Sequence, residues 1–344
     1  MPWKRQEPDY LLERDLLRLH GERNNTPITS TCPASRLPLP LAYSIRYHLI
    51  LKKRDTMNEI ISKTLLSDGV YQIQVRSPHI ASERKPGQFV IVQLDTHFGE
   101  RIPLTIADAD ADEGSITLIF QAVGKTTQDL ATLDVGDSID NLLGPLGQPT
   151  HIENFGTVVC VGGGIGVAPL HPIAKALKQA GNHVVTIVGA RNRELLILED
   201  EMREIADEFI VCTDDGSYGR KALVTEPLKE YCERDPAPSL VVAIGPPVMM
   251  KFCAETTRPF GVHTVVSLNT IMIDGTGMCG GCRVTVGDDT KFVCVDGPEF
   301  DGHLVDFDNM IQRLGAYKVQ EQEAHSCNME AQAKALETKK NANA

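Results

Sequence analysis

A short stretch near the carboxyl end of this 344-residue chain gathers three cysteines and one aspartate on a glycine-rich backbone. It reads Ile273-Asp274-Gly275-Thr276-Gly277-Met278-Cys279-Gly280-Gly281-Cys282, and Cys294 follows twelve residues later. The glycines let backbone N–H groups approach sulfur without a Cβ clash, and Cys-x-x-Cys points both sulfurs into one loop. Three ligands on a tight loop and a fourth on a returning strand suit either a 2Fe-2S cluster or a tetrahedral zinc ion. We therefore expect Asp274, Cys279, Cys282 and Cys294 to hold a metal centre.

The other cysteines stand singly, at positions 32, 160, 212, 232, 253 and 327. Cys160 and Cys212 lie inside apolar runs, where a cysteine behaves as a small buried hydrophobic residue. Nine cysteines is an odd number without disulfide-like spacing, and no segment reads as a signal peptide. The sequence therefore predicts a protein of the reducing cytoplasm.

Composition excludes two classes of partner. The net charge of −12 and the pI near 5.3 argue against nucleic-acid binding, which depends on basic surface. No apolar run approaches the roughly 20 residues needed to cross a bilayer, so no membrane association is expected. A chain of this length, at roughly 100 to 200 residues per domain, suggests two or three domains with small molecules or proteins as partners.

The two ends of the chain differ from the middle. Residues 1–56 carry ten Lys or Arg against six Asp or Glu, with closely spaced prolines between positions 27 and 40. We expect this segment to be a disordered extension, because it is too rich in proline for regular structure and too acidic for a transit peptide. Residues 316–344 are rich in Glu, Lys, Gln, Asn and Ala, and we expect a frayed helix or a loose tail.

Residues 57–153 show the pattern of a small antiparallel β-barrel. The segments 71–75, 88–94 and 115–120 alternate with a period of two and are separated by Gly, Pro and Asp turns. The segment from Arg101 to Thr105 is expected to end a strand, and Gly124-Lys125-Thr126-Thr127 to begin a helix.

From residue 154 the pattern changes to apolar strands alternating with amphipathic helices. Strands are predicted at 158–161, 184–188, 209–212 and 240–244, and a helix at 171–180. This alternation is typical of a parallel sheet flanked by helices, so an α/β domain is expected over 154–260 with 240–244 as its last strand. The cysteine-rich segment, 261–315, follows as an appendix.

Glycine-rich turns end two of these predicted strands. The turn from Gly162 to Pro169 leads into a helix, where small residues let a pyrophosphate approach backbone N–H groups. It does not have the G-x-G-x-x-G spacing, and Arg191 instead of an acidic residue follows the second strand, so a dinucleotide would be held differently from the common Rossmann mode. A second turn, Gly245-Pro246-Pro247, lies at the same edge. Taken singly, each motif also fits an ordinary turn.

Taken together, the order of the motifs resembles the ferredoxin-NADP reductase superfamily. The motifs are Pro86-Gly87-Gln88-Phe89, Arg101-x-Pro103-Leu104-Thr105, Gly144-Pro145-Leu146-Gly147, the turn from Gly162 to Pro169, and Gly245-Pro246. The resemblance covers about residues 57–315, and the cysteine segment narrows it to relatives of the dihydroorotate dehydrogenase electron-transfer subunit. It implies an FAD-binding β-barrel, an α/β parallel-sheet domain for a nicotinamide dinucleotide, and a small C-terminal 2Fe-2S segment.

The resemblance also implies residue roles. Arg101 would face an FAD phosphate, and Pro103, Leu104 and Thr105 would line the isoalloxazine, with Thr105 near flavin N5 as the catalytic residue. The FAD pyrophosphate would be bound by Gly124, Lys125, Thr126 and Thr127. The nicotinamide dinucleotide would be surrounded by Gly163, Gly164, Gly166, Arg191, Asp214, Asp215 and Gly245.

Asp274 stands where dihydroorotate dehydrogenase electron-transfer subunits usually have their first cysteine. An aspartate with three cysteines looks more like the small subunit of NADH-dependent reduced ferredoxin:NADP oxidoreductase, also described as a sulfide dehydrogenase subunit. We therefore expect an oxidoreductase subunit that passes electrons between NAD(H), FAD and a 2Fe-2S cluster to or from a larger flavin and iron–sulfur partner. The alternatives are the subunit for dihydroorotate oxidation and, in another class, a non-catalytic binding module stabilised by zinc.

The residues leave open whether the dinucleotide is NAD(H) or NADP(H). Arg191 would suit the 2′-phosphate of NADP(H). The resemblance instead implies NAD(H) for this subunit, and the neighbouring run Leu195-Leu196-Ile197-Leu198 adds no positive charge. We expect NAD(H).

Overall fold

The computed structural model describes residues 57–96, 99–323 and 326–327. Residues 57–323 fall within one compact unit, Asp55–Ala344. The extension expected over 1–56 and most of the tail expected over 316–344 lie outside the described residues, although helical backbone is present at 318–323. No described helix is both long enough and apolar enough to span a bilayer.

The first domain is a six-stranded antiparallel sheet in the order β1-β2-β5-β4-β3-β6. Its elements are β1 (Ile60–Ser67), β2 (Val70–Arg76), α2 (Pro78–Glu83), β3 (Phe89–Gln93), β4 (Arg101–Asp110), β5 (Ser115–Gln121), α3 (Lys125–Thr132) and β6 (Asn141–Leu146). A bridge between Glu59 and Ser138 joins the segment before β1 to the segment before β6. The two edges of the sheet therefore meet, which closes the predicted barrel.

Alternation explains the barrel core. Ile116, Leu118 and Phe120 of β5 are buried in one cluster, as the period of two predicted. Strand β3 differs, because it is buried on both faces: Val90 and Val92 enter the barrel core, while Phe89 and Ile91 enter the core of the following domain. One motif was misplaced, since Arg101 begins β4 and does not end a strand.

The second domain is a seven-stranded sheet in the order β10-β9-β8-β7-β11-β12-β15. Its strands are β7 (Thr157–Gly163), β8 (His183–Ala190), β9 (Glu208–Thr213), β10 (Arg220–Lys221), β11 (Leu240–Ile244), β12 (His263–Ser267) and β15 (Glu299–Asp301). All are parallel except β15, which runs antiparallel to β12. The predicted strands at 158–161, 184–188, 209–212 and 240–244 are confirmed.

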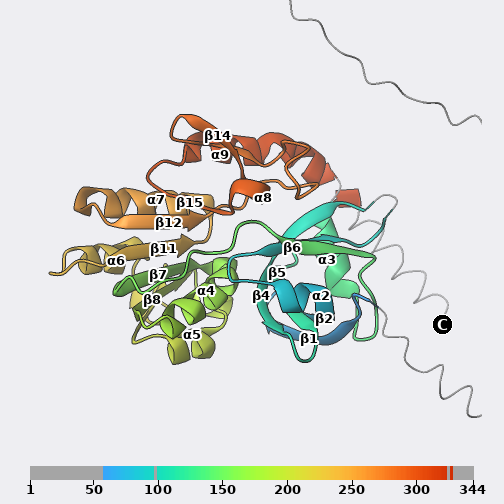
Figure 1. Cartoon of the computed structure of the whole chain (residues 1–344), viewed down its shortest axis with the longest axis horizontal. Helices are drawn as coiled ribbons and strands as arrows, with labels where there is room; N and C mark the ends of the chain where they lie inside the picture. Colours follow the sequence, from blue (N-terminus) through green and yellow to red (C-terminus); the bar gives the residue numbers. More distant parts are fainter. Residues whose placement is uncertain (1–56, 97–98, 324–325, 328–344) are drawn as a thin grey trace, which may run out of the picture. The chain divides into compact units, whose positions relative to one another are not determined.

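Helices cover both faces of this sheet (Figure 1). The helices are α4 (Val167–Gln179), α5 (Glu199–Ile205), α6 (Thr225–Cys232) and α7 (Pro247–Thr257). Leu170 of α4 and Met202 of α5 share one core, while Leu228 of α6 and Met250 of α7 share the other. Helix α4 begins four residues before the predicted helix at 171–180, because the short helix η1 (Gly164–Gly166) leads directly into it.

The expectation that 240–244 is the last strand was wrong. Strand β12 pairs in parallel with β11, and β15 pairs with β12. Both come from the segment expected to be a separate appendix, so the sheet continues across residue 260. Central parallel strands are buried on both faces, and the short run His263–Ser267 carries too few apolar residues to stand out.

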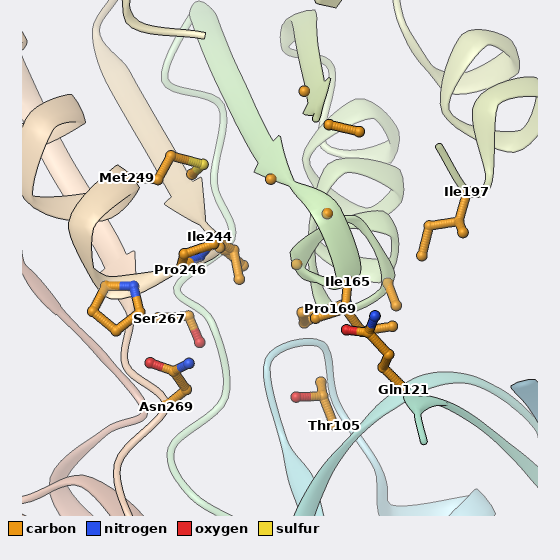
Figure 2. Close-up of a pocket in the computed structure, with 18 of the residues that line it drawn as sticks. Thr105, Gln121, Ile165, Pro169, Ile197, Ile244, Pro246, Met249, Ser267 and Asn269 are labelled. Atoms are coloured by element: carbon orange, nitrogen blue, oxygen red, sulfur yellow. The ribbon is translucent and has the colours of Figure 1, made fainter. Parts of the chain in front are cut away.

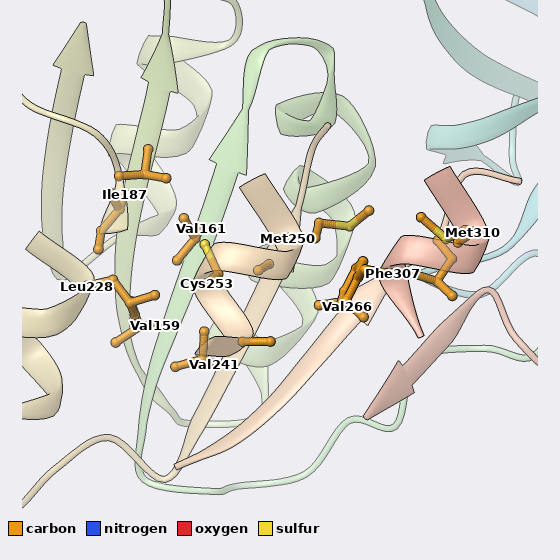
Figure 3. Packing of buried hydrophobic residues seen from close by; sticks show 14 of the residues in the cluster. Val159, Val161, Ile187, Leu228, Val241, Met250, Cys253, Val266, Phe307 and Met310 are labelled. Atoms are coloured by element: carbon orange, nitrogen blue, oxygen red, sulfur yellow. The ribbon is translucent and has the colours of Figure 1, made fainter. Parts of the chain in front are cut away.

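The cysteine segment forms a hairpin and short helices beside this sheet. Its elements are β13 (Arg283–Val286), β14 (Asp289–Phe292), the single-turn helix α8 (Val293–Asp296) and α9 (Phe307–Leu314). Figure 3 shows Phe307 and Met310 of α9 close to Val266 of β12 and Met250 of α7. These side chains belong to one buried cluster with Cys282 and Cys294, so the segment and the α/β domain share a core.

Candidate functional site

A cavity of about 990 Å³ lies between the barrel and the carboxyl ends of the parallel strands. Figure 2 shows Thr105 and Gln121 of the barrel facing Ile165, Pro246 and Asn269 across it. Ten of the predicted cofactor residues line this cavity: Pro103, Leu104, Thr105, Thr127, Gly163, Gly164, Gly166, Arg191, Asp214 and Gly245. Open α/β sheets bind ligands at this edge, so the fold brings the predicted flavin and dinucleotide residues to one place.

Several other predicted residues do not line the cavity: Arg101, Gly124, Lys125, Thr126 and Asp215. Sequence reasoning also missed four polar residues that do line it, Gln121, Thr225, Ser267 and Asn269. Gln121 is the last residue of β5, and a polar residue at the end of an alternating run could have been predicted to lie at the site. Ser267 is the last residue of β12, a strand that was not predicted, and Asn269 follows two residues later.

Close packing explains one glycine of the first turn, and a positive φ explains another. A Cβ atom on Gly166 would lie 2.4 Å from the carbonyl oxygen of Ile244. Gly164 has a φ of +55° and nothing within 4 Å of its Cβ position, so its backbone borders open space in the cavity wall. Helix α4 starts immediately afterwards, and its N-terminal N–H groups and dipole favour a phosphate group.

The N-terminus of α3 is capped from within. The Thr127 hydroxyl accepts hydrogen bonds from the N–H groups of Val123 (3.1 Å) and Gly124 (3.0 Å). The buried Thr126 hydroxyl donates to the Glu100 carboxylate at 2.7 Å. Lys125 pairs with Asp129 at 2.7 Å, and this hydrogen bond raises the pKa of Lys125. Only Thr127 of the four predicted residues reaches the cavity.

Arg101 lies at the entrance to β4, with an exposed side chain. Its Nε donates to the side-chain oxygen of Gln93 across the strand pair at 3.4 Å. The same oxygen accepts from Asn141 of β6 at 3.5 Å. Arg101 is thus oriented by its neighbouring strand and does not line the described cavity.

Opposite charges follow β8 and β9 at the cavity rim. Arg191 and Asp214 both line the cavity. The loop is held by backbone bonds, because the N–H of Asp214 donates to Ala190 and that of Asp215 donates to Arg191. The Asp215 carboxylate accepts from Ser217, which lowers the pKa of Asp215. Asp215 therefore shapes the turn, while Arg191 and Asp214 line the cavity.

The predicted metal ligands lie as two pairs. In the first, the Asp274 carboxylate accepts the backbone N–H groups of Thr276 (3.0 Å) and Cys279 (2.7 Å). In the second, the sulfur atoms of Cys282 and Cys294 lie 3.2 Å apart, and both residues are buried. Burial, followed by the neighbouring Cys282, raises the pKa of Cys294 to about 12. Cys294 comes from helix α8, directly after β14, instead of from the expected strand.

The arrangement of the four predicted ligands as two pairs helps to decide between a zinc ion and a 2Fe-2S cluster. Among residues 57–96, 99–323 and 326–327, no three His, Cys, Asp or Glu side chains gather in a group that could hold a metal ion. A single zinc ion needs all four ligands around one atom, whereas a 2Fe-2S cluster takes two ligands on each iron. The spacing Asp274-x4-Cys279-x2-Cys282 also matches the plant-type cluster loop, with Asp in place of the first Cys. The donor set therefore fits a cluster better than an ion.

Glycines bring the loop against the barrel. Gly275 has a φ of +74°, and a Cβ atom there would lie 2.7 Å from Leu146 and 2.8 Å from Ile91. These two side chains belong to β6 and β3. The backbone next to Asp274 can thus lie directly on the barrel wall, which only glycine permits.

Family models match two parts of the chain. The iron–sulfur cluster binding domain of dihydroorotate dehydrogenase B matches residues 269–306, and the oxidoreductase NAD-binding domain matches residues 160–255. The first match covers all four predicted metal ligands, and the second covers the glycine turns and Arg191. These matches favour the iron–sulfur interpretation over the zinc-stabilised module.

Curated relatives and a solved structure cover most of the chain. A Thermotoga maritima protein named as a homologue of the dihydroorotate dehydrogenase B (NAD(+)) electron transfer subunit is 49% identical over 265 residues, which is 77% of this chain and 93% of that protein. An uncharacterised Clostridium beijerinckii protein is 44% identical over 279 residues, 78% of this chain and 93% of that protein. A structure described as NADH-dependent reduced ferredoxin-NADP oxidoreductase is 47% identical with a TM-score of 0.75, over 80% of this chain and 98% of that one. The chain therefore belongs to the family of dihydroorotate dehydrogenase B electron-transfer subunits.

Proposed function

We propose that this chain is the FAD- and iron–sulfur-carrying electron-transfer subunit of a larger oxidoreductase and that it passes electrons between NAD(H) and a partner subunit. One observation carries the proposal. Ser267, Asn269 and Met272 line the cavity between barrel and sheet, and Asp274, a predicted metal ligand, follows two residues later. One backbone segment thus runs from the cavity to the cluster loop, and electron transfer requires the two cofactors to be neighbours.

The barrel side of the cavity suits a flavin ring. Pro103 and Leu104 provide apolar surface, and Thr105 provides a hydroxyl beside them on β4. We assign these residues to the isoalloxazine, with Thr105 near flavin N5. Arg101 and the N-terminus of α3 from Gly124 to Thr127 are assigned to the FAD phosphates, which favour a guanidinium and free helix N–H groups.

The sheet side of the cavity suits a dinucleotide. We assign its pyrophosphate to the turn containing Gly163, Gly164 and Gly166, and its nicotinamide to the region of Gly245 beside the barrel. Arg191 and Asp214 are assigned to the ribose portion, with Asp215 holding the turn. FAD, when bound, can take two electrons from the nicotinamide and release them singly, which is the chemistry needed before a one-electron centre. The residues of the chain orient the two rings and exclude water.

Asp274, Cys279, Cys282 and Cys294 are assigned to a 2Fe-2S cluster. Cys282 and Cys294 form its buried side, and Cys279 lies on its exposed side. An exposed ligand next to solvent is suited to exchange electrons with another polypeptide. The electrons then pass to or from a partner with its own redox centre.

We infer that the partner is a larger flavin and iron–sulfur subunit of the kind found in electron-bifurcating NADH-dependent reduced ferredoxin-NADP oxidoreductase. Asp274 in the first ligand position supports this assignment, as does the likeness to that solved structure. The names of other relatives favour the second candidate, a partner that oxidises dihydroorotate. In both cases we propose that the complex is cytoplasmic. We also propose that this chain oxidises NADH when it is separated from its partner.

Purification of the tagged chain from its native cells tests the proposal. We expect one FAD and two iron atoms per chain, flavin and iron–sulfur absorption bands, and reduction of both by NADH. The co-purifying subunit, identified by mass spectrometry, decides between the two partners. Stoichiometric zinc without iron, or an absence of flavin, would refute the proposed function.

A further inference from the structure

Two arginines bind the backbone between the two central cysteines of the loop. The Arg283 Nη1 donates to the carbonyl oxygen of Gly280 at 3.0 Å, and the Arg313 Nη2 donates to that of Gly281 at 3.1 Å. Gly280 and Gly281 are the two residues between Cys279 and Cys282. Two of the three peptide units between Cys279 and Cys282 therefore carry a guanidinium on their carbonyl oxygen.

The first contact reaches a sulfur atom through one peptide unit. The carbonyl of Gly280 and the N–H of Gly281 belong to the same peptide group, and this N–H donates to the Cys279 sulfur at 3.4 Å. Arg283 thus begins a series of hydrogen-bonded groups: its guanidinium binds the carbonyl of Gly280, and the N–H of the same peptide group binds the sulfur of Cys279. Hydrogen bonds connected in this way polarise one another, and a cation at the carbonyl end strengthens the N–H···S bond at the other.

The second contact comes from outside the matched iron–sulfur domain. Arg313 belongs to α9, which packs on the β13 side of the hairpin and begins after residue 306, where the match ends. Arg283, Arg313 and Cys279 line one cleft of about 290 Å³, with Ile273 and Tyr317. The two guanidinium groups therefore lie on the same side of the loop as its exposed sulfur.

Neither Arg283 nor Arg313 forms an ion pair with a carboxylate of the described residues. In the part of the chain that the structure describes, the arginines that form ion pairs are Arg76, Arg84, Arg203, Arg220 and Arg234. Arg283 and Arg313 form hydrogen bonds to carbonyl oxygens instead. Their charge is consequently available to the loop, and water screens the half-buried Arg313 less than the exposed Arg283.

We propose that Arg283 and Arg313 are positioning residues that raise the reduction potential of the cluster. This inference rests on the proposed function, because it requires a cluster on the loop. One-electron reduction adds a negative charge that stays on the cluster without a bond being made or broken. Two cations, and an N–H···S bond strengthened by one of them, stabilise the reduced form more than the oxidised form. Hydrogen bonds to the sulfurs and local charge are known determinants of cluster potential.

The test is a redox titration of the purified chain followed by electron paramagnetic resonance. Arg283→Gln removes the charge and the end of the hydrogen-bond chain, so we expect the potential to become more negative. A tenfold change in the equilibrium constant of this one-electron couple corresponds to about 59 mV. We expect Arg313→Gln to shift the potential in the same direction by a smaller amount, because its peptide does not donate to Cys279 in the structure. Arg283→Lys, which keeps the charge, should lie closer to the parent chain.

Arg258→Gln is the matched control. Arg258 also donates from Nη2 to a carbonyl oxygen, that of His303, at 2.7 Å, but it lies outside the loop. An Arg258→Gln shift as large as that of Arg283→Gln would overturn the inference, as would unchanged potentials in both loop variants. Where one of the two Gln variants assembles no cluster, the other Gln variant carries the comparison with Arg258→Gln. Absence of iron from the parent chain would instead refute the proposed function, so the two failures are distinguishable.

Discussion

The cavity and the cluster loop are built in different ways. The cavity is walled by residues on strand ends, and backbone glycines such as Gly163 and Gly166 pack against Met249 and Ile244. The cluster loop depends on side chains, and its four predicted ligands lie as two separate pairs. A site made from the ends of a rigid sheet forms with the fold itself. A site made from side chains on a loop is completed by the metal that binds there.

Among the variants that test this difference between the two sites, Cys282→Ala should have the largest effect. We expect complete loss of the cluster, because one ligand of the buried pair disappears, while FAD stays bound in its own cavity. Iron content and the visible spectrum measure both outcomes. Cys327→Ser, at an exposed cysteine far along the chain, serves as the control and should keep the cluster. Loss of FAD together with iron would show that the two sites are not independent.

Asp274→Cys replaces one predicted ligand of the cluster with another and keeps four ligands in place. Four thiolates should still assemble a cluster, but its potential should change because a carboxylate is a harder donor than a thiolate. A variant with the parent's potential would contradict Asp274 as a ligand.

Glu299→Gln probes the junction between the two regions. Thr150, after the barrel, donates to the Glu299 carboxylate of β15 at 2.5 Å. Burial raises the pKa of Glu299 from 4.5 to about 7, partly offset by this hydrogen bond. The folded state therefore favours the protonated form, so the contribution of Glu299 to stability is fully present below pH 4.5 and is lost as the pH rises to about 7. The loss amounts to about 3 kcal/mol in the free energy of unfolding.

At pH 8 we therefore expect the Glu299→Gln variant to be more stable than the parent chain, and its stability to vary less between pH 5 and 8. Urea unfolding across this range measures both. Thr150→Val removes the hydrogen bond that favours the charged form and should move the loss of stability to higher pH. An unchanged pH profile in Glu299→Gln would rule out this carboxyl as the source.

Gly166→Ala tests whether the cavity turn is set by close packing. The added methyl group would lie 2.4 Å from the Ile244 carbonyl oxygen, and such overpacking costs about 1–3 kcal/mol. We expect lower thermal stability and weaker NADH binding with the cluster retained. Gly315→Ala is the control, because nothing lies within 4 Å of its Cβ position and its φ is −79°. Equal stability of the two variants would mean that the turn tolerates a side chain.

Arg101→Ala should weaken FAD binding, with about a tenfold rise in Kd if one charge-assisted hydrogen bond is lost. Isothermal titration of the flavin-free chain with FAD measures this. Arg203→Ala, which removes a surface arginine paired with Glu199, should leave the Kd unchanged. Unaltered FAD affinity in Arg101→Ala would reassign Arg101 to the strand contact with Gln93 seen in the structure.

The smallest effect is expected at Arg191. Hydride transfer to FAD in the parent chain should be faster from NADH than from NADPH at equal concentration, because Asp214 at the same rim repels a 2′-phosphate. Arg191→Ala should reduce the NADH rate only modestly, which stopped-flow absorbance can measure. A clear preference for NADPH in the parent chain, abolished by Arg191→Ala, would instead assign Arg191 to the 2′-phosphate.

Local pattern determined a large part of this protein. The period of two in 115–120 predicted β5, and the apolar runs predicted β7, β8, β9 and β11, because alternation and burial are properties of neighbouring residues. The spacing of Asp274, Cys279, Cys282 and Cys294 was likewise visible, since four ligands close in sequence need little help from the fold. The turn from Gly162 to Pro169 was recognised for the same reason.

Tertiary structure alone decided which distant residues meet. Strand β12 was missed because its place beside β11 depends on a partner in the sheet and not on its own periodicity. The double burial of β3, the contact of Glu299 with Thr150 and the reach of Arg313 to Gly281 each join residues that no local pattern connects. Such contacts arise only when separate elements pack, because hydrogen bonds and apolar contacts act over a few ångströms in space, whatever the separation along the chain.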